Sequence, residues 1–244
     1  MINAGRFHYQ KSQFYTVIDL KIQEEGYNSI FMLMSGTLTR TRIIETSIKL
    51  FNQQGTQNVR LQQIADDVGI SVGNLAYHFH DKKKILRSSI ALVTKAFYDA
   101  DRGWKNLTQF IDFDNQLARH YHLLNTYAFY FLDVVDIKRF YPDIYEGHQA
   151  QIEGFIKNLA CWLENGVEKD LFVPPKREGQ YADVSQTIWF IGAFWMSKKR
   201  IIEEAEEDFE LGFKKMIWQQ LEPFFSPKGK TEFDLMIAPA LYMS

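Results

Sequence analysis

The sequence predicts an all-α protein, and three observations indicate this fold class. Residues that break helices are sparse: the 244-residue chain has six prolines and 14 glycines, and residues 1–141 contain no proline. Apolar side chains recur at intervals of three and four residues, which is the spacing of one face of an α-helix. Hydrophobic residues make up 46% of the chain and charged residues 24%, which is the composition of a globular protein and not of a disordered one.

The first two predicted helices lie between residues 39 and 69. The first begins near Thr39 and ends before Gly55, because glycine readily adopts the left-handed conformation that ends a helix. A shorter second helix ends at Gly69 for the same reason. The apolar faces are Ile43, Ile44, Ile48 and Phe51 in the first helix, and Leu61, Ile64, Ala65 and Val68 in the second.

Two further helices each follow a residue that is suited to capping. The side-chain oxygen of Ser71 can accept a hydrogen bond from a backbone N–H two or three residues later, and so can that of Asp81. The third helix then points Val72, Leu75 and Phe79 inward. The apolar face of the fourth helix consists of Ile85, Leu86, Ser89, Ile90, Val93 and Phe97.

The rest of the chain is predicted to form longer helices. We expect them over residues 113–135, 142–166, 180–204 and 206–225, with a loop at the two prolines of residues 174–175. The long helices follow from the helical spacing of the apolar residues, which are rich in Phe, Tyr and Trp.

The second and third predicted helices, joined by Gly69-Ile70-Ser71, have the arrangement of a helix-turn-helix. In such a unit, the N-terminal part of the second helix enters the major groove of DNA. Small residues allow close approach to a groove, Asn74 and His78 can form hydrogen bonds with base edges or phosphates, and Tyr77 can reach a phosphate. The outward face of the third helix consists of Gly73, Asn74, Ala76, Tyr77 and His78.

The distribution of charge favours contact between this region and a polyanion. Residues 37–95 contain nine Lys or Arg and four Asp or Glu, a net charge of +5, whereas the whole chain has a net charge of −2. The run Lys82-Lys83-Lys84 lies in the first turn of the fourth helix, where each cation opposes the helix macrodipole at a cost of ~0.3–1 kcal/mol. A bound phosphate would offset this cost. The alternative, a solvated run of charge, is disfavoured because the run directly follows a helix-turn-helix.

Residues 40–86 resemble the N-terminal DNA-binding domain of the TetR/AcrR family of bacterial transcriptional regulators. The resemblance is carried, in order, by Arg42-Ile43-Ile44, Leu50-Phe51, Gly55, Ile64-Ala65, Val68-Gly69-Ile70-Ser71, Gly73-Asn74-Leu75-Ala76-Tyr77-His78-Phe79, Lys82 and Ile85-Leu86. The sequence departs from the family pattern at Arg60, where the family often has a capping Ser or Thr, and at Ala76, which replaces the first aromatic residue. Lys83 and Lys84 replace residues that are commonly acidic, which should strengthen nonspecific attraction to phosphates.

The resemblance implies a homodimer that inserts its two third helices into successive major grooves of a palindromic double-stranded DNA operator. It also implies a helical C-terminal domain that binds a small-molecule effector and thereby releases the DNA, so that the protein acts as a repressor. By position, the residues expected to contact DNA are Arg60, Ser71, Val72, Gly73, Asn74, Tyr77, His78, Lys82 and Lys83.

Two sets of residues in the C-terminal part are candidates for effector and dimer contacts. An apolar effector pocket is expected among Tyr127, Phe131, Phe155, Leu159, Trp162 and Trp189. By the family resemblance, the last two long helices would pack against the partner subunit through Ile188, Ile191, Trp195, Phe209, Phe213 and Met216. Ordinary core packing within one chain is the alternative for both sets.

Other classes of function have little support in the sequence. There is no P-loop, G-x-S-x-G, H-E-x-x-H or G-x-G-x-x-G motif, and a chain with one cysteine, Cys161, cannot form a C-x-x-C site. We therefore expect no enzymatic activity, no metal and no cofactor. The apolar runs are far shorter than the ~20 residues that span a bilayer, so we expect a cytoplasmic protein without membrane contact. The alternative function is a ligand-binding or protein-interaction dimer that keeps the fold without specific DNA recognition.

The expected domains follow these assignments. They are a helix-turn-helix domain at residues 37–85, a helical ligand-binding and dimerisation domain at 86–226, and a C-terminal tail at 227–244. Residues 1–36 fit no part of the resemblance. Either they precede a natural start at Met32 or Met34, which we favour, or they are a real extension that packs on the protein or on DNA.

Overall fold

The computed structural model describes residues 37–144, 148–202 and 208–242, and in these ranges the regular elements are helices. The expected all-α class is therefore confirmed. Within the described ranges, no helix is long and apolar enough to cross a membrane. The two alternatives for residues 1–36 concern a segment outside the described residues.

The described residues divide into two compact units. Unit 1 consists of the described residues up to Thr46 together with Arg60–Lys82, and unit 2 consists of Ser47–Val59 and the residues from Lys83 onward. A first helix, residues 37–54, contributes to both units, because its residues up to Thr46 belong to unit 1 and the others to unit 2.

Unit 1 contains the start of the first helix, α2 (Leu61–Val68) and α3 (Val72–His78). Gly69 sets the turn between α2 and α3: it has a φ of 78°, and its N–H donates to the carbonyl oxygen of Ala65 at 3.0 Å. The Ser71 hydroxyl then caps α3 by accepting from the N–H of Asn74 at 3.1 Å. The buried apolar side chains are Ile43, Ile64, Ala65, Val68, Leu75 and Phe79, all of which the periodicity predicts. It also predicts Ile44, Leu61 and Val72, but these are only half-buried.

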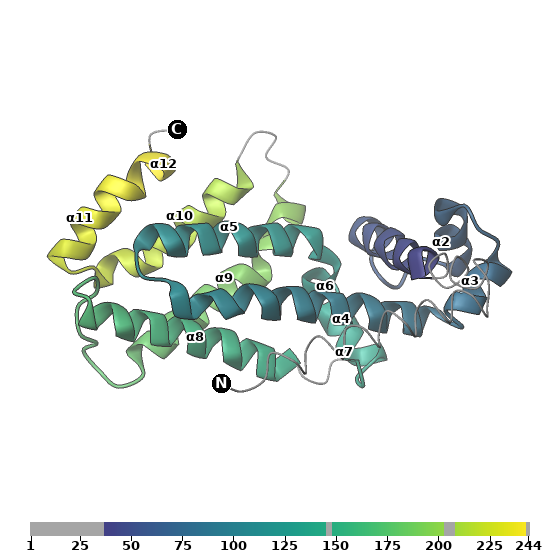
Figure 1. The fold of residues 1–244 in the computed structure, drawn as a ribbon, viewed down its shortest axis with the longest axis horizontal. Helices are drawn as coiled ribbons and strands as arrows, with labels where there is room; N and C mark the ends of the chain where they lie inside the picture. The colour runs from purple at the N-terminus through teal and green to yellow at the C-terminus, as the bar shows by residue number, and fades with distance from the viewer. Residues whose placement is uncertain (1–36, 145–147, 203–207, 243–244) are drawn as a thin grey trace, which may run out of the picture. The chain divides into compact units, whose positions relative to one another are not determined.

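Unit 2 contains the remaining helices (Figure 1). The first of them, α4, begins at Lys82, the last residue of unit 1, and lies otherwise in unit 2. In chain order the elements are α4 (Lys82–Asp101), the 3₁₀-helix η1 (Arg102–Asn106), α5 (Phe110–Thr126), α6 (Ala128–Leu132), α7 (Val134–Phe140), α8 (His148–Glu168), α9 (Gln180–Ile201), α10 (Phe209–Leu221), η2 (Glu222–Phe224), α11 (Pro227–Met236) and α12 (Ala238–Tyr242).

Helix α9 is central to unit 2, since it packs against α5, α6, α8 and α10 (Figure 1). Much of the core between these helices is aromatic. Phe113 of α5 stacks on Trp162 of α8 with ring centroids 4.3 Å apart, and Trp218 of α10 meets Phe113 edge-on at 5.1 Å. Such ring pairs contribute about 0.5–1.5 kcal/mol each beyond the area they bury.

The helix predicted over residues 113–135 is wrong in its length, because the chain leaves helical geometry at Tyr127 and at Asp133. Asn52, on the first helix, satisfies the backbone groups at the first break: its Nδ2 donates to the carbonyl oxygen of Thr126 at 2.9 Å, and its Oδ1 accepts from the N–H of Phe129 at 2.8 Å. At the second break, the Asp133 carboxylate accepts from the N–H of Thr56. The breaks are therefore stabilised by residues more than 70 positions away in the sequence.

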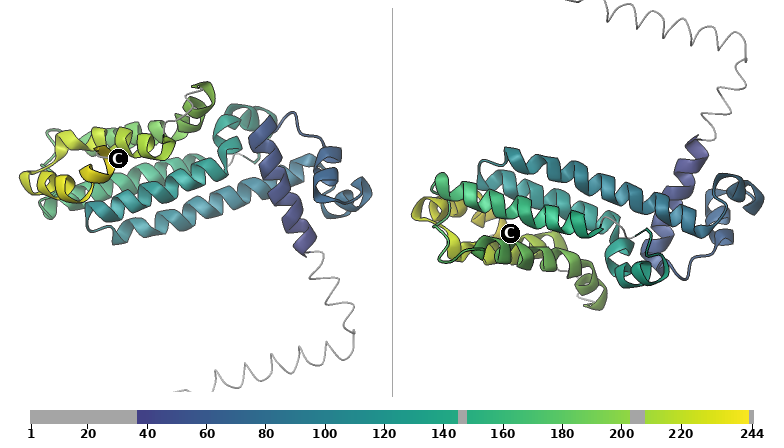
Figure 2. Two further views of the ribbon diagram at one scale, coloured as in Figure 1. Left: turned by 90° about the horizontal axis from the view of Figure 1, so that it is seen from above. Right: turned by 90° about the horizontal axis from the view of Figure 1, so that it is seen from below.

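The predicted C-terminal tail is also wrong, because residues 227–242 form α11 and α12. Both views in Figure 2 show these two helices at one end of the unit 2 bundle. Helix α11 packs on α5 and α12 on α10, and Phe233, Ile237 and Leu241 are buried there. Ser226 caps α11 by accepting from the N–H of Gly229 at 3.0 Å, and Pro227 provides its first residue.

Candidate nucleic-acid interface and internal cavity

The outer face of α3 in unit 1 is exposed, as a helix that reads DNA requires. Tyr77 is 86% exposed, and Gly73 and Asn74 are also exposed. Leu75 and Phe79 are fully buried on the opposite face and fix the rotation of the helix. Val72 and His78 are half-buried at the edges of this face, and Ser71 uses its hydroxyl oxygen for the cap. The structure thus places the predicted α3 residues on one continuous surface.

Two arginines of the first helix hold α2 and α3, a role that the sequence analysis did not predict. Arg40 donates to the carbonyl oxygen of His78 at 3.0 Å, and its guanidinium lies 4.1 Å from the centre of the Phe79 ring. Arg42 donates to the carbonyl oxygen of Val68 at 2.7 Å. Both bonds satisfy carbonyl groups at the C-terminal ends of helices, where cations are favourable. The arginines therefore fix the C-terminal ends of α2 and α3 against the first helix.

Arg60 immediately precedes α2, at the position where the family often has a capping hydroxyl. Arginine has no acceptor atom and cannot take over that role. Instead, Gln63 Oε1 accepts from the backbone N–H of Arg60 at 2.7 Å, which supplies the other half of a capping box. The Arg60 side chain is exposed, so its guanidinium remains accessible to a phosphate.

The three lysines at the start of α4 have different surroundings. Partial burial lowers the pKa of Lys82 from its usual range, because a buried ammonium group loses hydration. Lys83 forms an ion pair with Asp143 at 3.0 Å, and Arg87 pairs with the same carboxylate. Hydrogen bonds from Lys83 and Arg87 lower the pKa of Asp143. Lys83 therefore already has a carboxylate partner that a phosphate would have to displace.

Unit 2 contains a cavity of about 80 Å³ that is lined by residues of α4, η1, α5, α6, α8, α9 and α10. Eight of the 18 residues that line it are Phe, Tyr or Trp, and none is Lys or Arg. Polar side chains are represented by Asp101, His120 and Gln151. An apolar cavity with a small number of polar groups is the usual form of a small-molecule site.

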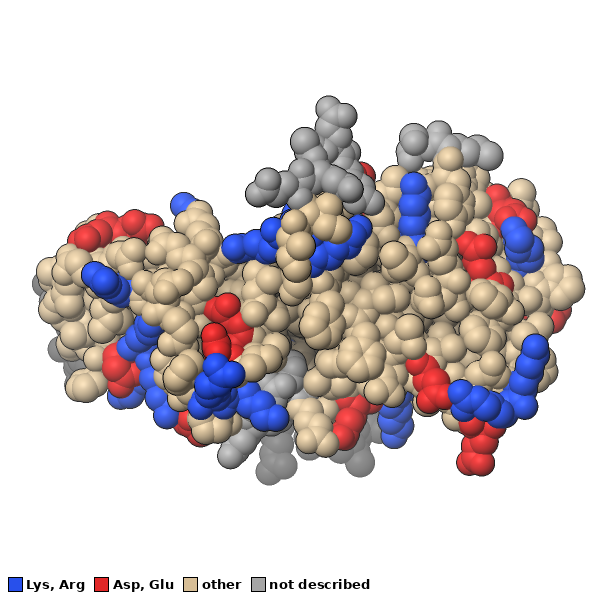
Figure 3. Space-filling view, turned by 180° about the vertical axis from the view of Figure 1, so that it is seen from behind, with Lys and Arg blue, Asp and Glu red and all other residues tan. Residues whose placement is uncertain are grey.

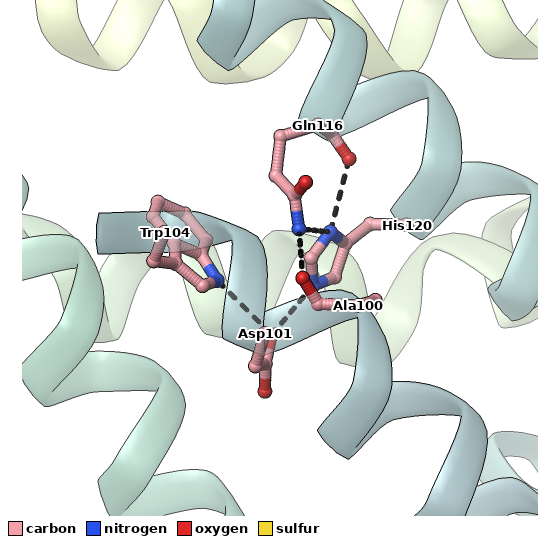
Figure 4. Close-up of polar contacts among 5 residues, drawn as sticks. All are labelled: Ala100, Asp101, Trp104, Gln116 and His120. Carbon is pink, nitrogen blue, oxygen red and sulfur yellow. Dashed lines mark hydrogen bonds and ion pairs between the residues drawn. The ribbon is translucent and has the colours of Figure 1, made fainter. Parts of the chain in front are cut away.

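Asp101 is the centre of a polar network beside the cavity (Figure 4). Its Oδ1 accepts from Trp104 Nε1 and from His120 Nε2, both at 3.0 Å. On the other side of the imidazole, His120 Nδ1 lies 3.0 Å from the carbonyl oxygen of Gln116 and 3.3 Å from Gln116 Nε2. The first neighbour is an acceptor and the second a donor, so the Nδ1 contacts suit either protonation state of the ring. Nε2, in contrast, must donate, because a carboxylate only accepts.

The structure brings part of the predicted effector set together. Phe131, Phe155 and Trp189 line the cavity. Leu159 and Trp162 do not, and this part of the prediction is wrong, because both are buried in the core and Trp162 stacks on Phe113. Tyr127 is also outside the lining, at the break between α5 and α6. Helical periodicity finds the apolar residues but does not show which of them border an empty space.

The predicted dimer seam needs a similar correction. Ile188, Trp195 and Phe213 are at most 4% exposed within one chain, so they are not available to a partner subunit. Ile191 and Phe209 are half-buried, and Met216 is exposed. The predicted seam did not include Phe190 and Phe194, which are 47% and 62% exposed on α9. Figure 3, which views the side of α9 and α10, shows a broad area with few charged side chains.

Comparisons with known proteins agree with both units. Residues 43–88 match the family model described as bacterial regulatory proteins, tetR family, and residues 100–233 match the one described as bacterial transcriptional repressor. A curated relative is the biofilm operon icaADBC HTH-type negative transcriptional regulator IcaR of Staphylococcus aureus. It is 26% identical over 184 residues, which cover 70% of this chain and 92% of the relative.

Solved structures share the fold. A TetR-family transcriptional regulator from Marinobacter aquaeolei aligns with a TM-score of 0.69 at 20% identity, over 80% of this chain and 96% of that one. A putative transcriptional regulator from Saccharomonospora viridis, crystallised in complex with choline, aligns with a TM-score of 0.63 at 18% identity, over 78% and 98% of the two chains.

Proposed function

The chain belongs to the TetR family of bacterial regulatory proteins, and on that premise we propose that it is a homodimeric repressor that a small apolar effector releases from a palindromic operator. Membership of the family makes it a DNA-binding transcriptional regulator with an N-terminal helix-turn-helix. We propose repression rather than activation because the S. aureus relative is a negative regulator. The operator symmetry is proposed from the two-fold symmetry of a homodimer, which two equal half-sites would match.

The observation that carries the proposal is the exposed face of α3. Small Gly73 allows the backbone to approach a groove, exposed Asn74 offers an amide that pairs well with adenine, and Tyr77 reaches outward. The other proposed DNA contacts are Arg60, Ser71, Val72, His78, Lys82 and Lys83. Phosphate contacts from the cationic members would set the position on DNA, and the α3 side chains would read the bases.

The cavity of unit 2 supports release by an effector. All of its lining residues except Phe97 lie in the part of the chain that matches the repressor model, and Phe131, Phe155 and Trp189 give it an apolar wall. The S. viridis structure holds a small organic molecule, choline, which provides a precedent for effector binding in this fold. An effector shifts the equilibrium only if it binds the DNA-free arrangement more tightly than the DNA-bound one.

A DNA-binding titration tests the proposal. The probe is the DNA immediately upstream of the protein's own gene, with a scrambled duplex as competitor, at two salt concentrations. We expect Tyr77→Ala to weaken specific binding by about tenfold, equal to 1.4 kcal/mol. The matched control is Tyr98→Ala, which removes a tyrosine that is 64% exposed on α4 and should leave affinity unchanged.

The dependence of DNA affinity on salt concentration distinguishes contacts with phosphates from contacts with bases. Loss of one phosphate contact in Lys82→Ala should reduce the slope of log affinity against log salt by about 0.9. Equal affinity for the probe and the scrambled duplex, unaffected by Tyr77→Ala, would contradict specific recognition of this site. It would support instead a dimer of this fold that binds ligands or proteins.

A further inference from the structure

We propose that the effector of the unit 2 cavity is an organic cation, with an ammonium group on a compact apolar body. This inference rests on the proposed function, because it specifies the chemistry of the effector. Asp101 supplies a carboxylate and Gln151 an amide oxygen, whereas no lysine or arginine is among the lining residues.

The Asp101 carboxylate keeps an oxygen for a ligand. Both hydrogen bonds that it accepts, from Trp104 and His120, go to Oδ1, and none of the described hydrogen bonds uses Oδ2. Apart from the imidazole of His120, whose Nε2 donates to Oδ1, no basic side chain is among the lining residues to balance the charge of Asp101. A cationic ligand would supply a balancing charge, whereas an anionic ligand would place two like charges in an apolar cavity.

Gln151 adds a second acceptor. Its Oε1 is buried, and no described residue donates a hydrogen bond to it. A buried acceptor without a donor is costly, because it has lost its hydrogen bonds to water. An ammonium group has several N–H donors and can donate to more than one acceptor of the lining, such as Oε1 of Gln151 or an oxygen of Asp101. A hydroxyl group has one donor and can satisfy only one of them.

Aromatic rings complete the environment of a cation. Trp104 and Phe155 meet at right angles, with centroids 5.7 Å apart, and Phe97 and Phe131 form another edge-on pair at 5.6 Å. All four line the cavity. The negative face of an aromatic ring attracts ammonium groups, most strongly where water is excluded. The same rings contact the apolar body of the ligand.

The cavity volume limits the size of this body. An apolar cavity of about 150 Å³ accommodates benzene, and the space here is about 80 Å³. A ligand with a single ring therefore requires small movements of the lining. Phe131, Phe155 and Trp189 are half-buried rather than buried, so they are the rings that can move with least loss of packing.

Three probes of one skeleton and different charge test the inference: benzylammonium, benzyl alcohol and benzoate. Binding is measured on the full chain without DNA, by calorimetry and by tryptophan fluorescence, to which Trp104 and Trp189 of the cavity lining contribute. We expect benzylammonium to bind at least about tenfold more tightly than benzyl alcohol, and benzoate to bind most weakly. Equal binding of the cation and the alcohol, tighter binding of benzoate, or no binding of benzylammonium would each overturn the inference.

Two substitutions with matched controls locate the binding. Asp101→Asn removes the charge but retains an acceptor for Trp104 and His120, and should lower affinity for benzylammonium about tenfold while leaving that for benzyl alcohol unchanged. Its control is Asp99→Asn, on the same helix, where the exposed carboxylate pairs with Lys95. Gln151→Leu should also weaken cation binding. Its control is Gln149→Leu, an exposed position on α8. An unchanged affinity in both Asp101→Asn and Gln151→Leu would contradict the proposed site.

The DNA titration and the ligand titration can fail separately. Specific DNA binding without affinity for benzylammonium would leave the repressor proposal standing and remove this inference. Cation binding that depends on Asp101, in a protein without specific DNA binding, would support the ligand class and remove the repressor. If both hold, saturating benzylammonium should release the operator from the wild-type protein and release less of it from the Asp101→Asn variant at the same concentration.

Discussion

At the scale of single residues, the role of a glycine depends on what packs against it. A Cβ atom at Gly166 of α8 would lie 2.4 Å from Cδ2 of Phe172, so the ring of this buried phenylalanine fits only against a glycine. Gly154, on the same helix, has nothing within 4 Å of the corresponding position. The two glycines look alike in the sequence and differ completely in their packing.

This contrast gives a prediction for a matched pair of substitutions. Gly166→Ala should lower the free energy of unfolding by about 1–3 kcal/mol, because the added methyl group overpacks the core around Phe172. Gly154→Ala should raise it by about 0.5–1 kcal/mol, because glycine is unfavourable inside a helix. Urea denaturation of both variants checks the difference. Equal effects of the two substitutions would show that Phe172 moves aside without cost.

The cap of α3 by Ser71 could be predicted from the sequence, whereas the hydrogen bond from Arg40 to the end of that helix could not. Ser71 acts on Asn74, three residues away, and this pattern is visible in the sequence. Arg40 acts on His78 across 38 residues. Nothing about an arginine on a predicted helix indicates which distant carbonyl group it will meet, so its role appears only when the helices are assembled.

At the scale of elements, periodicity predicted the presence of helices better than their ends. The segment after residue 113 has an uninterrupted helical pattern, and its break at Tyr127 depends on the amide of Asn52, a tertiary contact. The missed helix α11 is a different case. Its Ser226-Pro227 start is a capping residue followed by proline at the first helical position, which is a signal readable from the sequence.

The start of α5 depends on one carboxylate, and its contribution should vary with pH. Asp112 Oδ2 accepts from the N–H of Thr108 at 2.9 Å and from that of Gln109 at 3.0 Å. The bond from the Thr108 N–H is the main cause that lowers the pKa of Asp112. A lowered pKa means that the folded state favours the charged form, so this stability is present above the pKa of the unfolded chain and is lost as pH falls through the folded value.

We therefore expect Asp112→Asn to lower the free energy of unfolding by about 1 kcal/mol at pH 7. The difference from the wild type should shrink as the pH falls below about 4, because the carboxylate is protonated first in the unfolded chain and, at lower pH, in the folded protein as well. Denaturation curves at several pH values measure it, with Asp234→Asn on the exposed face of α11 as the control. A difference that stays constant down to low pH would mean that the charge of Asp112 contributes nothing.

At the scale of the whole molecule, the homodimer remains a proposal, and the structure shows which of its predicted interface residues are exposed. The sequence identified α9 and α10 by family resemblance, but three of the six residues it named face the interior of the chain. Helix α9 has apolar residues on several faces, so the periodicity of its sequence does not show which of them point outward. Exposure selects Phe190 and Phe194 instead.

We expect Phe194→Glu to convert a dimer into monomers, because it would place a charge in the apolar part of the interface. Sedimentation velocity measures the change, and operator affinity should fall with it, since each monomer reads one half-site. Leu235→Glu is the matched control, because Leu235 is 73% exposed on α11. A Phe194→Glu variant that sediments as the wild-type dimer would place the interface elsewhere.

The hydrogen bonds of Asn52 have a further consequence for exchange with solvent. The N–H of Phe129 comes just after the break at Tyr127, and its described acceptor is the Oδ1 of Asn52, which belongs to the first helix. Its deuterium uptake is therefore not governed by the local fraying of α6 alone. Slow exchange of this one amide proton therefore reports that the C-terminal half of the first helix is in place, and it can be measured without an added probe.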